Sequence, residues 1–454
     1  MTYYNKNRLG TLFIFVFATY LISLSSINLC LASDTVWSLY QKAVEKDPLL
    51  KEAQAELKAS VAERPLAKSQ LMPKLEAQIG QGYYDKNISG IGPSDIKKDY
   101  WGDNYGVRLI QPIFNGQAYV SLKMAESLIS AQQAQVILAK QELIRKVAIA
   151  YLNLLDAQAD LVVAKERVKL DARILSRAKT FLKVGTGDIV SVKEAEARLD
   201  AARAEVLNAM NLVSIKRTDL SVAAHTEVAD IVDVRPFTPL HPEPDDPDAW
   251  IKAALENQPI LKEAKQKLLL ATQKIEHERR ARWPRIDLEG VASYANGQFL
   301  PDVIYREAHG VFKFTFPLYL GGSIGARTKQ AEKKALAARH RFDRLKDIVT
   351  LDTQRAFLKL KDSVAQIHAA EKAMESARVS MKATNKGYEV GTRDVIDVLD
   401  MTDKYLTRRS QFYRALYNHL KARILLKSAS GTLTETDLKA LDGLLAYDQE
   451  EEGK

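Results

Sequence analysis

Two very long stretches of the chain lack the residues that end helices. Residues 117–182 contain no glycine or proline, and neither do residues 326–386. Apolar side chains recur within them at intervals of three and four, as at Leu360, Val364 and Ile367, which is the spacing of one helix face. A helix of ~65 residues would span ~100 Å. Such a rod is stable only when it packs along neighbouring helices, so the pattern predicts coiled-coil-like packing.

Each predicted rod is followed by a short glycine-containing break. The breaks lie at residues 183–187 and 389–392, and helical spacing resumes over 191–224 and 395–428. Glycine directly after a helical run is a typical C-terminal cap. Each half of the chain is therefore expected to carry a helical hairpin.

Four shorter segments alternate apolar and polar residues, the pattern of a β-strand. They are residues 75–83, 286–290, 311–316 and, less clearly, 107–111. Strands of ~10 residues with period two suit a membrane β-barrel, where aromatic residues gather near the strand ends. Aromatic residues lie near these expected ends at Tyr83, Tyr84, Tyr100, Trp101, Tyr294, Phe299 and Tyr319. A soluble sheet with one buried face would show the same alternation.

The chain also matches itself, roughly 210 positions further on. Each half is therefore expected to contain a helix, a strand, a loop, a strand, a long helix and a second helix. The register changes between Tyr84 and Tyr105, where we expect a loop because loops tolerate deletion. The matching pairs are 47–53 with 258–264, 72–75 with 283–286, 150–156 with 356–362, and 184–186 with 390–392.

Four membrane strands per chain imply an oligomer. A sheet with open edges cannot face lipid, and known membrane barrels begin at ~8 strands. Two chains would supply eight strands and three would supply twelve. A twelve-stranded barrel leaves room for a channel, whereas an eight-stranded barrel is filled by its own side chains.

The N-terminus has the layout of a secretory signal. Lys6 and Arg8 precede an apolar run at residues 11–24, and small residues follow near Ala32. Lipidation at Cys30, the only cysteine, is an alternative. No other stretch reaches the length of a membrane-spanning helix by this pattern. The net charge of +9 is spread among acidic residues, which together with export excludes nucleic acid as a partner.

Residues 387–400, Gly-Tyr-Glu-Val-Gly-Thr-Arg-Asp-Val-Ile-Asp-Val-Leu-Asp, resemble the helix–helix junction of the TolC family of outer-membrane channel-tunnels, and residues 427–433 resemble that family too. The resemblance implies a homotrimer in the outer membrane of a Gram-negative bacterium, with a twelve-stranded β-barrel continued by a long α-helical barrel through the periplasm. It implies a mixed belt around the middle. It also implies contact with outer-membrane lipid, a periplasmic adaptor, and an inner-membrane ABC or proton-driven transporter.

The same resemblance implies a gate at the periplasmic end. Tyr388 and Arg393 match the latch positions of the family. The position of their acceptor, often aspartate in the family, is Ser191 here. Asp188, one turn earlier, is the candidate replacement.

Asp397 and Asp400 match the family's constriction aspartates. Residues three apart lie on one helix face, so three copies would place six carboxylates around one axis. Such rings would select cations and offer hard oxygen ligands to a multivalent ion. Solvated helix residues are the simpler alternative for both aspartates.

These patterns divide the chain into five expected parts. A signal peptide occupies residues 1–32, the first repeat 33–235 and an acidic, proline-rich connector 236–248. The second repeat occupies 249–433. The remaining residues, 434–454, are expected to form an equatorial or disordered tail.

The pattern offers no sign of an enzyme, a cofactor or a metal site. The seven histidines lack metal-ligand spacing. The glycine-rich residues 321–325 lack the Lys-Ser/Thr ending of a phosphate loop and suit a strand-to-helix turn. The expected function is a passive outer-membrane exit duct for type I protein secretion, multidrug efflux or both. A periplasmic coiled-coil adaptor or scaffold without a pore is the alternative.

Overall fold

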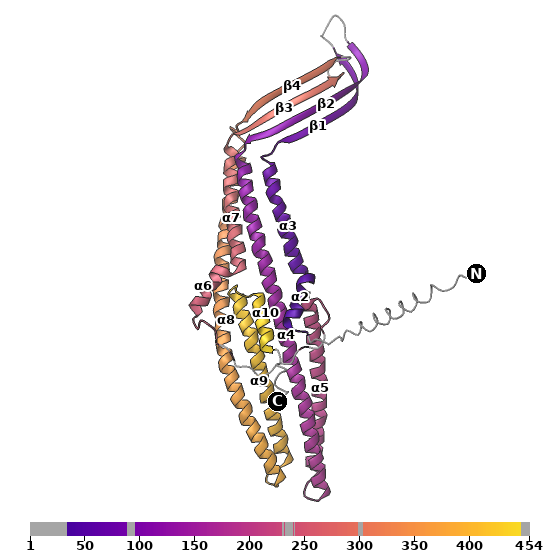
Figure 1. The fold of residues 1–454 in the computed structure, drawn as a ribbon, viewed down its shortest axis with the longest axis vertical. Coiled ribbons are helices and arrows are strands. Elements are labelled where there is room, and N and C mark those ends of the chain that lie inside the picture. Colours follow the sequence, from indigo (N-terminus) through magenta and orange to yellow (C-terminus); the bar gives the residue numbers. More distant parts are fainter. Residues whose placement is uncertain are drawn as a thin grey trace, which may run out of the picture.

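The computed structural model describes residues 34–88, 96–228, 231, 239, 241–297 and 303–445. The protomer is an elongated rod with a four-stranded sheet at one end and two helical hairpins at the other (Figure 1). In chain order the elements are α2 (Val36–Lys46), α3 (Pro48–Ser69), β1 (Lys74–Ile88), β2 (Ile96–Phe114), α4 (Gly116–Lys183), α5 (Ile189–Ala224), α6 (Pro247–Asn257), α7 (Pro259–Arg279), η1 (Arg280–Arg282), β3 (Arg285–Asn296), β4 (Ile304–Thr315), α8 (Ser323–Glu389), α9 (Val395–Ala429) and α10 (Glu435–Leu445).

The two long rods and the hairpins are confirmed. Helix α4 has 68 residues and α8 has 67, so each extends for about 100 Å. Helices α5 and α9 run back along them, within a few residues of the predicted bounds. By length and composition α4 contains a stretch able to cross a membrane, half of it buried inside the protomer. This corrects the expectation that no later segment reaches such a length.

The first helix of each half is split in two, which the pattern did not predict. The breaks fall at Asp47-Pro48 and Gln258-Pro259, at matching places in the two repeats. A residue before proline is pushed out of the helical region, and both Asp47 and Gln258 have ψ near 120°. Proline then begins the next helix, where its missing N–H costs nothing.

The four strands form one antiparallel sheet in the order β1-β2-β3-β4. Strands β1 and β2 extend through most of the region between Tyr84 and Tyr105, where a loop was expected. That prediction was wrong because consecutive pairs here, such as Asp85 with Asp99 and Lys86 with Lys98, are polar. Both faces of this part of the sheet are therefore polar, and the sequence shows no hydrophobic alternation. Strand β4 ends at Thr315, so Phe316 lies just beyond it, next to a proline that has no N–H to donate.

One face of this sheet is apolar across all four strands. Leu75 pairs with Leu109 and Ile79 with Tyr105, and Phe312 pairs with Leu288. Directly paired residues share a face. Several of these side chains are mostly exposed in the protomer, with relative exposures of 71% for Leu75, 79% for Ile79 and 63% for Phe312.

The opposite face of the sheet is polar. Glu289 on β3 accepts hydrogen bonds from Arg108 on β2 at 3.2 Å and from Lys313 on β4 at 3.1 Å. Aromatic side chains meet across the strands near the end away from the helices, where Tyr84 stacks on Tyr100 at 5.7 Å between ring centroids.

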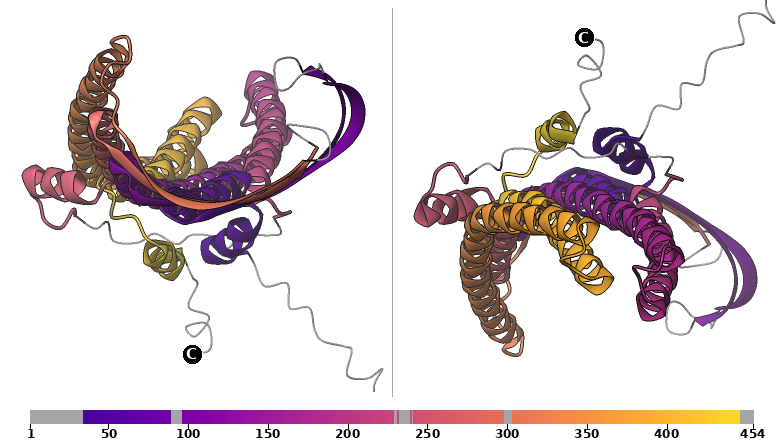
Figure 2. Two further views of the ribbon diagram at one scale, coloured as in Figure 1. Left: turned by 90° about the horizontal axis from the view of Figure 1, so that it is seen from above. Right: turned by 90° about the horizontal axis from the view of Figure 1, so that it is seen from below.

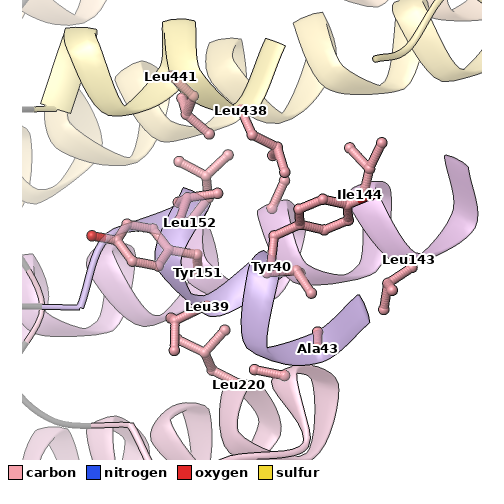
Figure 3. Close-up of a cluster of buried hydrophobic side chains, with 14 of the residues drawn as sticks. Leu39, Tyr40, Ala43, Leu143, Ile144, Tyr151, Leu152, Leu220, Leu438 and Leu441 are labelled. Carbon is pink, nitrogen blue, oxygen red and sulfur yellow. The ribbon is translucent and has the colours of Figure 1, made fainter. Parts of the chain in front are cut away.

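The sheet and long helices follow one curved wall, and α2, α6 and α10 lie on its convex side (Figure 2). The main apolar core sits at mid-height (Figure 1), where α2, α4, α5, α9 and α10 meet. Figure 3 shows part of it. Helix α10 falls in the expected tail 434–454 and was not predicted as a helix. Leu438 and Leu441 of α10 are buried there, close to Tyr40 of α2. Asp442 also accepts hydrogen bonds from the N–H groups of Val36 and Trp37, at 2.9 and 3.0 Å.

Several predictions fall outside the described residues. They are the signal peptide at 1–32 with Cys30, Phe299, residues 236–238 and 240 of the connector, and the acidic end of the tail. Helix α6 begins at Pro247, inside the range expected for the connector.

Two glycines with positive φ test how closely the chain packs after α9. Gly431 has φ +69° and Gly391 has φ +77°. A Cβ on Gly431 would lie 2.6 Å from the Cα of Gln258, whereas one on Gly391 meets nothing within 4 Å. We expect Gly391→Ala to cost about 1–2 kcal/mol of backbone strain and Gly431→Ala to cost clearly more. The melting temperature of each purified variant, followed by its helical circular dichroism, measures this difference. Equal decreases in melting temperature in the two variants would contradict this packing.

Candidate functional site

The two helical hairpins end together, away from the sheet, in turns of the same design (Figure 1). Gly185 joins α4 to α5 with φ +79°, and Gly391 joins α8 to α9 with φ +77°. In each turn the residue after the glycine donates its N–H to a carbonyl five residues earlier, at 3.0 Å in the first hairpin and 2.8 Å in the second. Only glycine adopts this backbone conformation without strain, so the duplicated Val-Gly-Thr sequence produces the same turn twice.

Tyr388 lies between the two hairpins. Its side chain is buried, and its ring centroid is 5.2 Å from that of Phe181 on α4. Burial raises the pKa of Tyr388, the carboxylate of Asp188 adds to the rise, and Arg177 opposes it. The aromatic contact belongs to an apolar cluster that joins the hairpins and contains Ile174, Leu175, Ala178, Val192, Ala195, Leu199, Val395, Val398 and Leu399.

A cleft of about 390 Å³ lies beside this aromatic pair. Tyr388, Arg393, Asp188 and Ser191 all line it. The structure therefore brings together the four residues that the sequence pointed to as a latch, although they come from both halves of the chain.

Asp188 and Ser191 bind each other. The carboxylate of Asp188 accepts the Ser191 N–H at 2.8 Å and the Ser191 hydroxyl at 2.7 Å, which caps α5. These two hydrogen bonds lower the pKa of Asp188, because they stabilise its charged form. Ser191 thus supports Asp188, which remains ionised at neutral pH and faces the cleft.

Asp397 and Asp400 occupy the start of α9, and each has a basic neighbour. The Nη1 atom of Arg393 lies 3.5 Å from the Oδ2 atom of Asp397. Arg198 on α5 donates to Asp400 at 3.0 Å. Asp400 is therefore bound to the first hairpin of its own chain, and about half of its side chain remains exposed.

Sequence reasoning missed the ion pairs that join the first hairpin to the second. Their members lie roughly 200 or more positions apart, so no local spacing reveals them. They run along the hairpins as Asp156–Lys421, Asp160–Arg414, Glu166–Arg409, Arg167–Asp403, Arg198–Asp400 and Arg177–Glu389.

The chain resembles several known proteins over most of its length. The sequence pattern of the outer membrane efflux protein family matches residues 39–224 and 250–432. Outer membrane protein TolC of Escherichia coli (strain K12) is 27% identical over 443 residues, which cover 94% of this chain and 88% of that protein. The alkaline protease secretion protein AprF of Pseudomonas aeruginosa is 25% identical over 417 residues, which cover 88% of this chain and 85% of AprF.

Solved structures share the fold. The outer-membrane channel OprN superimposes with a TM-score of 0.77 at 18% identity, covering 88% of this chain and 90% of that one. The CmeC outer membrane channel of Campylobacter jejuni gives a TM-score of 0.76 at 16% identity, covering 90% and 89%. This chain therefore shares with these channels a sheet continued by long helices.

The chain belongs to the outer membrane efflux protein family, and it has the fold of solved outer-membrane channels. The resemblance to the TolC family that was drawn from residues 387–400 is thereby confirmed. The alternative of a periplasmic adaptor without a pore finds no support among these relatives.

The Tyr388–Phe181 contact makes a local prediction. Tyr388→Ala removes a buried ring at a cost of about 3–5 kcal/mol, so amide hydrogens at the ends of α4 and α8 should exchange faster. Tyr388→Phe keeps the ring and is the matched control. Hydrogen-exchange mass spectrometry measures both, and unchanged exchange in Tyr388→Ala would show that the contact does not hold the tip.

Proposed function

We propose that three copies of this chain form a passive exit duct across the outer membrane and periplasm. A twelve-stranded barrel would sit in the membrane and an α-helical barrel would continue it. The observation that carries this proposal is the sheet, with a continuous apolar face and with β1 and β4 each paired on one side only among the described strands. Unpaired backbone groups at such edges are not tolerated in hydrocarbon.

The helices support the same closure. Along the upper half the packing order is α3, α4, α7, α8, and along the lower half it is α5, α4, α9, α8. Helices α3 and α5 therefore form one edge of the wall and α8 forms the other. Apolar side chains are exposed along these edges, including Val61 on α3, Leu207 and Ile215 on α5, and Leu351 and Val379 on α8. A second copy placed beside the first would cover them.

Relatives of two kinds bear on the cargo. AprF is an alkaline protease secretion protein, and BepC of Brucella suis is an outer membrane efflux protein. We propose that this duct serves type I protein secretion, multidrug efflux or both, with an inner-membrane transporter and a periplasmic adaptor. The duct itself performs no chemical reaction, and the transporter supplies the energy.

The hairpin cleft is the proposed gate. Tyr388 and Arg393 would hold the second hairpin near Asp188, the charged acceptor that Ser191 supports. In a trimer, Asp397 and Asp400 would bring six carboxylates towards the axis at the narrow end. At a separation of ~8 Å in water two charges repel by only about 0.5 kcal/mol, so wet rings are tolerable.

Adjacent positions on β4 test the membrane sheet. Phe312→Lys places a charge on the apolar face, where it costs about 2–4 kcal/mol at mid-membrane. Val311→Lys places the same charge on the polar face, beside Glu289. We expect Phe312→Lys to reduce the heat-resistant assembled form recovered from outer membranes and Val311→Lys to leave it unchanged. Equal recovery of the two variants would overturn the barrel.

The aspartate rings are tested by block of the open channel. Asp397→Asn combined with Asp400→Asn should weaken block by multivalent cations in planar bilayers, because hard cations bind carboxylate oxygens. The same double change at the exposed Asp343 and Asp347 of α8 is the control. Block that is as strong in the ring variant as in wild type would reject the rings.

A further inference from the structure

A group of charged side chains joins the two hairpins above the gate cleft. Arg167 of α4 forms ion pairs with Glu205 of α5 and Asp403 of α9, both at 2.6 Å. Arg198 of α5 donates to Asp400 of α9 at 3.0 Å. Two arginines of the first hairpin thus hold two aspartates of the second.

These pairs surround a small cavity. Its volume is about 120 Å³, and Arg167, Asp171, Arg198, Glu205 and Asp403 provide its polar lining. Arg167 is the more buried of the two arginines, with a side-chain exposure of 21% against 41% for Arg198. Its Nε is fully buried and makes no hydrogen bond. A buried charge that loses its partner is costly, so Arg167 resists any movement that separates the three helices.

Asp171 of α4 adds a buried acid to this group. It is 5% exposed, and burial raises its pKa to about 6. Arg167 and Arg198 oppose this rise, whereas Asp403 and Glu205 reinforce it. Four carboxylates, counting Asp400, therefore share two arginines at the junction of α4, α5 and α9.

We propose that Arg167 and Arg198 form a lock that fixes the second hairpin to the first, and that the tip of the duct opens only when α9 leaves them. This proposal rests on the proposed duct. It assigns gating to a group distinct from Tyr388 and Arg393, and it makes Asp400 a partner of the lock as well as a lumen carboxylate. The lock lies within one protomer, so each copy releases its own hairpin.

The buried acid makes the lock sensitive to pH. An exposed aspartate has a pKa of 3.8, whereas Asp171 in the lock has a pKa of about 6. The locked state therefore binds the proton more tightly than a state in which water reaches Asp171. By linkage, the lock is favoured as the pH falls towards 4 and weakened as the pH rises through 6.

The lock is tested by the single-channel conductance of the full-length protein in planar bilayers. Arg167→Gln leaves Asp171, Glu205 and Asp403 facing one another without their central cation, so conductance should rise about twofold or more as the open state gains population. Asp403→Asn in the same background should add little, because coupled partners are not additive. Arg203→Gln is the matched control, since Arg203 pairs only with Asp200 on its own helix at 3.0 Å among the contacts described.

Each outcome decides one question. A wild-type protein that forms no channel would refute the duct itself. A conducting wild type with equal conductance in Arg167→Gln and Arg203→Gln would refute the lock alone. Should Arg167→Gln not assemble, Arg198→Gln breaks the more exposed arm, and an unchanged conductance there would also refute the lock.

A second readout concerns the buried acid. Wild-type conductance should rise between pH 5.5 and pH 7.5, as Asp171 loses its proton. Asp171→Asn, which stays neutral, should remove this rise and hold the conductance at its lower value. A pH response that is unchanged in Asp171→Asn would show that the acid takes no part in the lock.

Discussion

The architecture of the whole molecule depends on how the backbone N–H and C=O groups at the edges of a membrane sheet find hydrogen-bond partners. Hydrocarbon offers them no hydrogen bonds, and the described part of this chain supplies four strands, with β1 and β4 at the two edges. In the proposed duct, further copies of the chain pair with these edges and close the wall. The helices continue that wall, because the order of their packing follows the order of the strands above them.

At the other end of the molecule, the contacts between the two helical hairpins decide whether the tip is closed. Near the tip, the hairpins meet through one small apolar cluster around Tyr388 and through ion pairs. Of these, Arg177–Glu389 and Arg198–Asp400 are half-exposed, whereas the Arg167–Asp403 pair is more buried at its arginine. Exposed pairs contribute little each, so the hairpins can separate without unfolding the rods. The mid-height core therefore supports a tip whose two hairpins are held together by the cluster around Tyr388 and by the ion pairs of Arg167 and Arg198.

Much of this architecture is predictable from local sequence. The absence of glycine and proline is enough to find α4 and α8, and the duplicated Val-Gly-Thr places both turns. Helix α10 was missed, although Leu438 and Leu441 have helical spacing, because it is only 11 residues long and follows a break. Of the site, Tyr388, Arg393, Asp188 and Ser191 were found through the resemblance. Arg167, Asp171 and Arg198 were not, since their partners on α9 lie some 200 positions away and only the folded chain brings them together.

The central claim is that identical copies share one barrel wall. Native mass spectrometry of the purified protein, released from gentle detergent, tests it most directly. We expect a complex of three protomers, each close to the 50.8 kDa of the chain less any segment removed on export. A single protomer, or a complex whose mass corresponds to two copies, would contradict it.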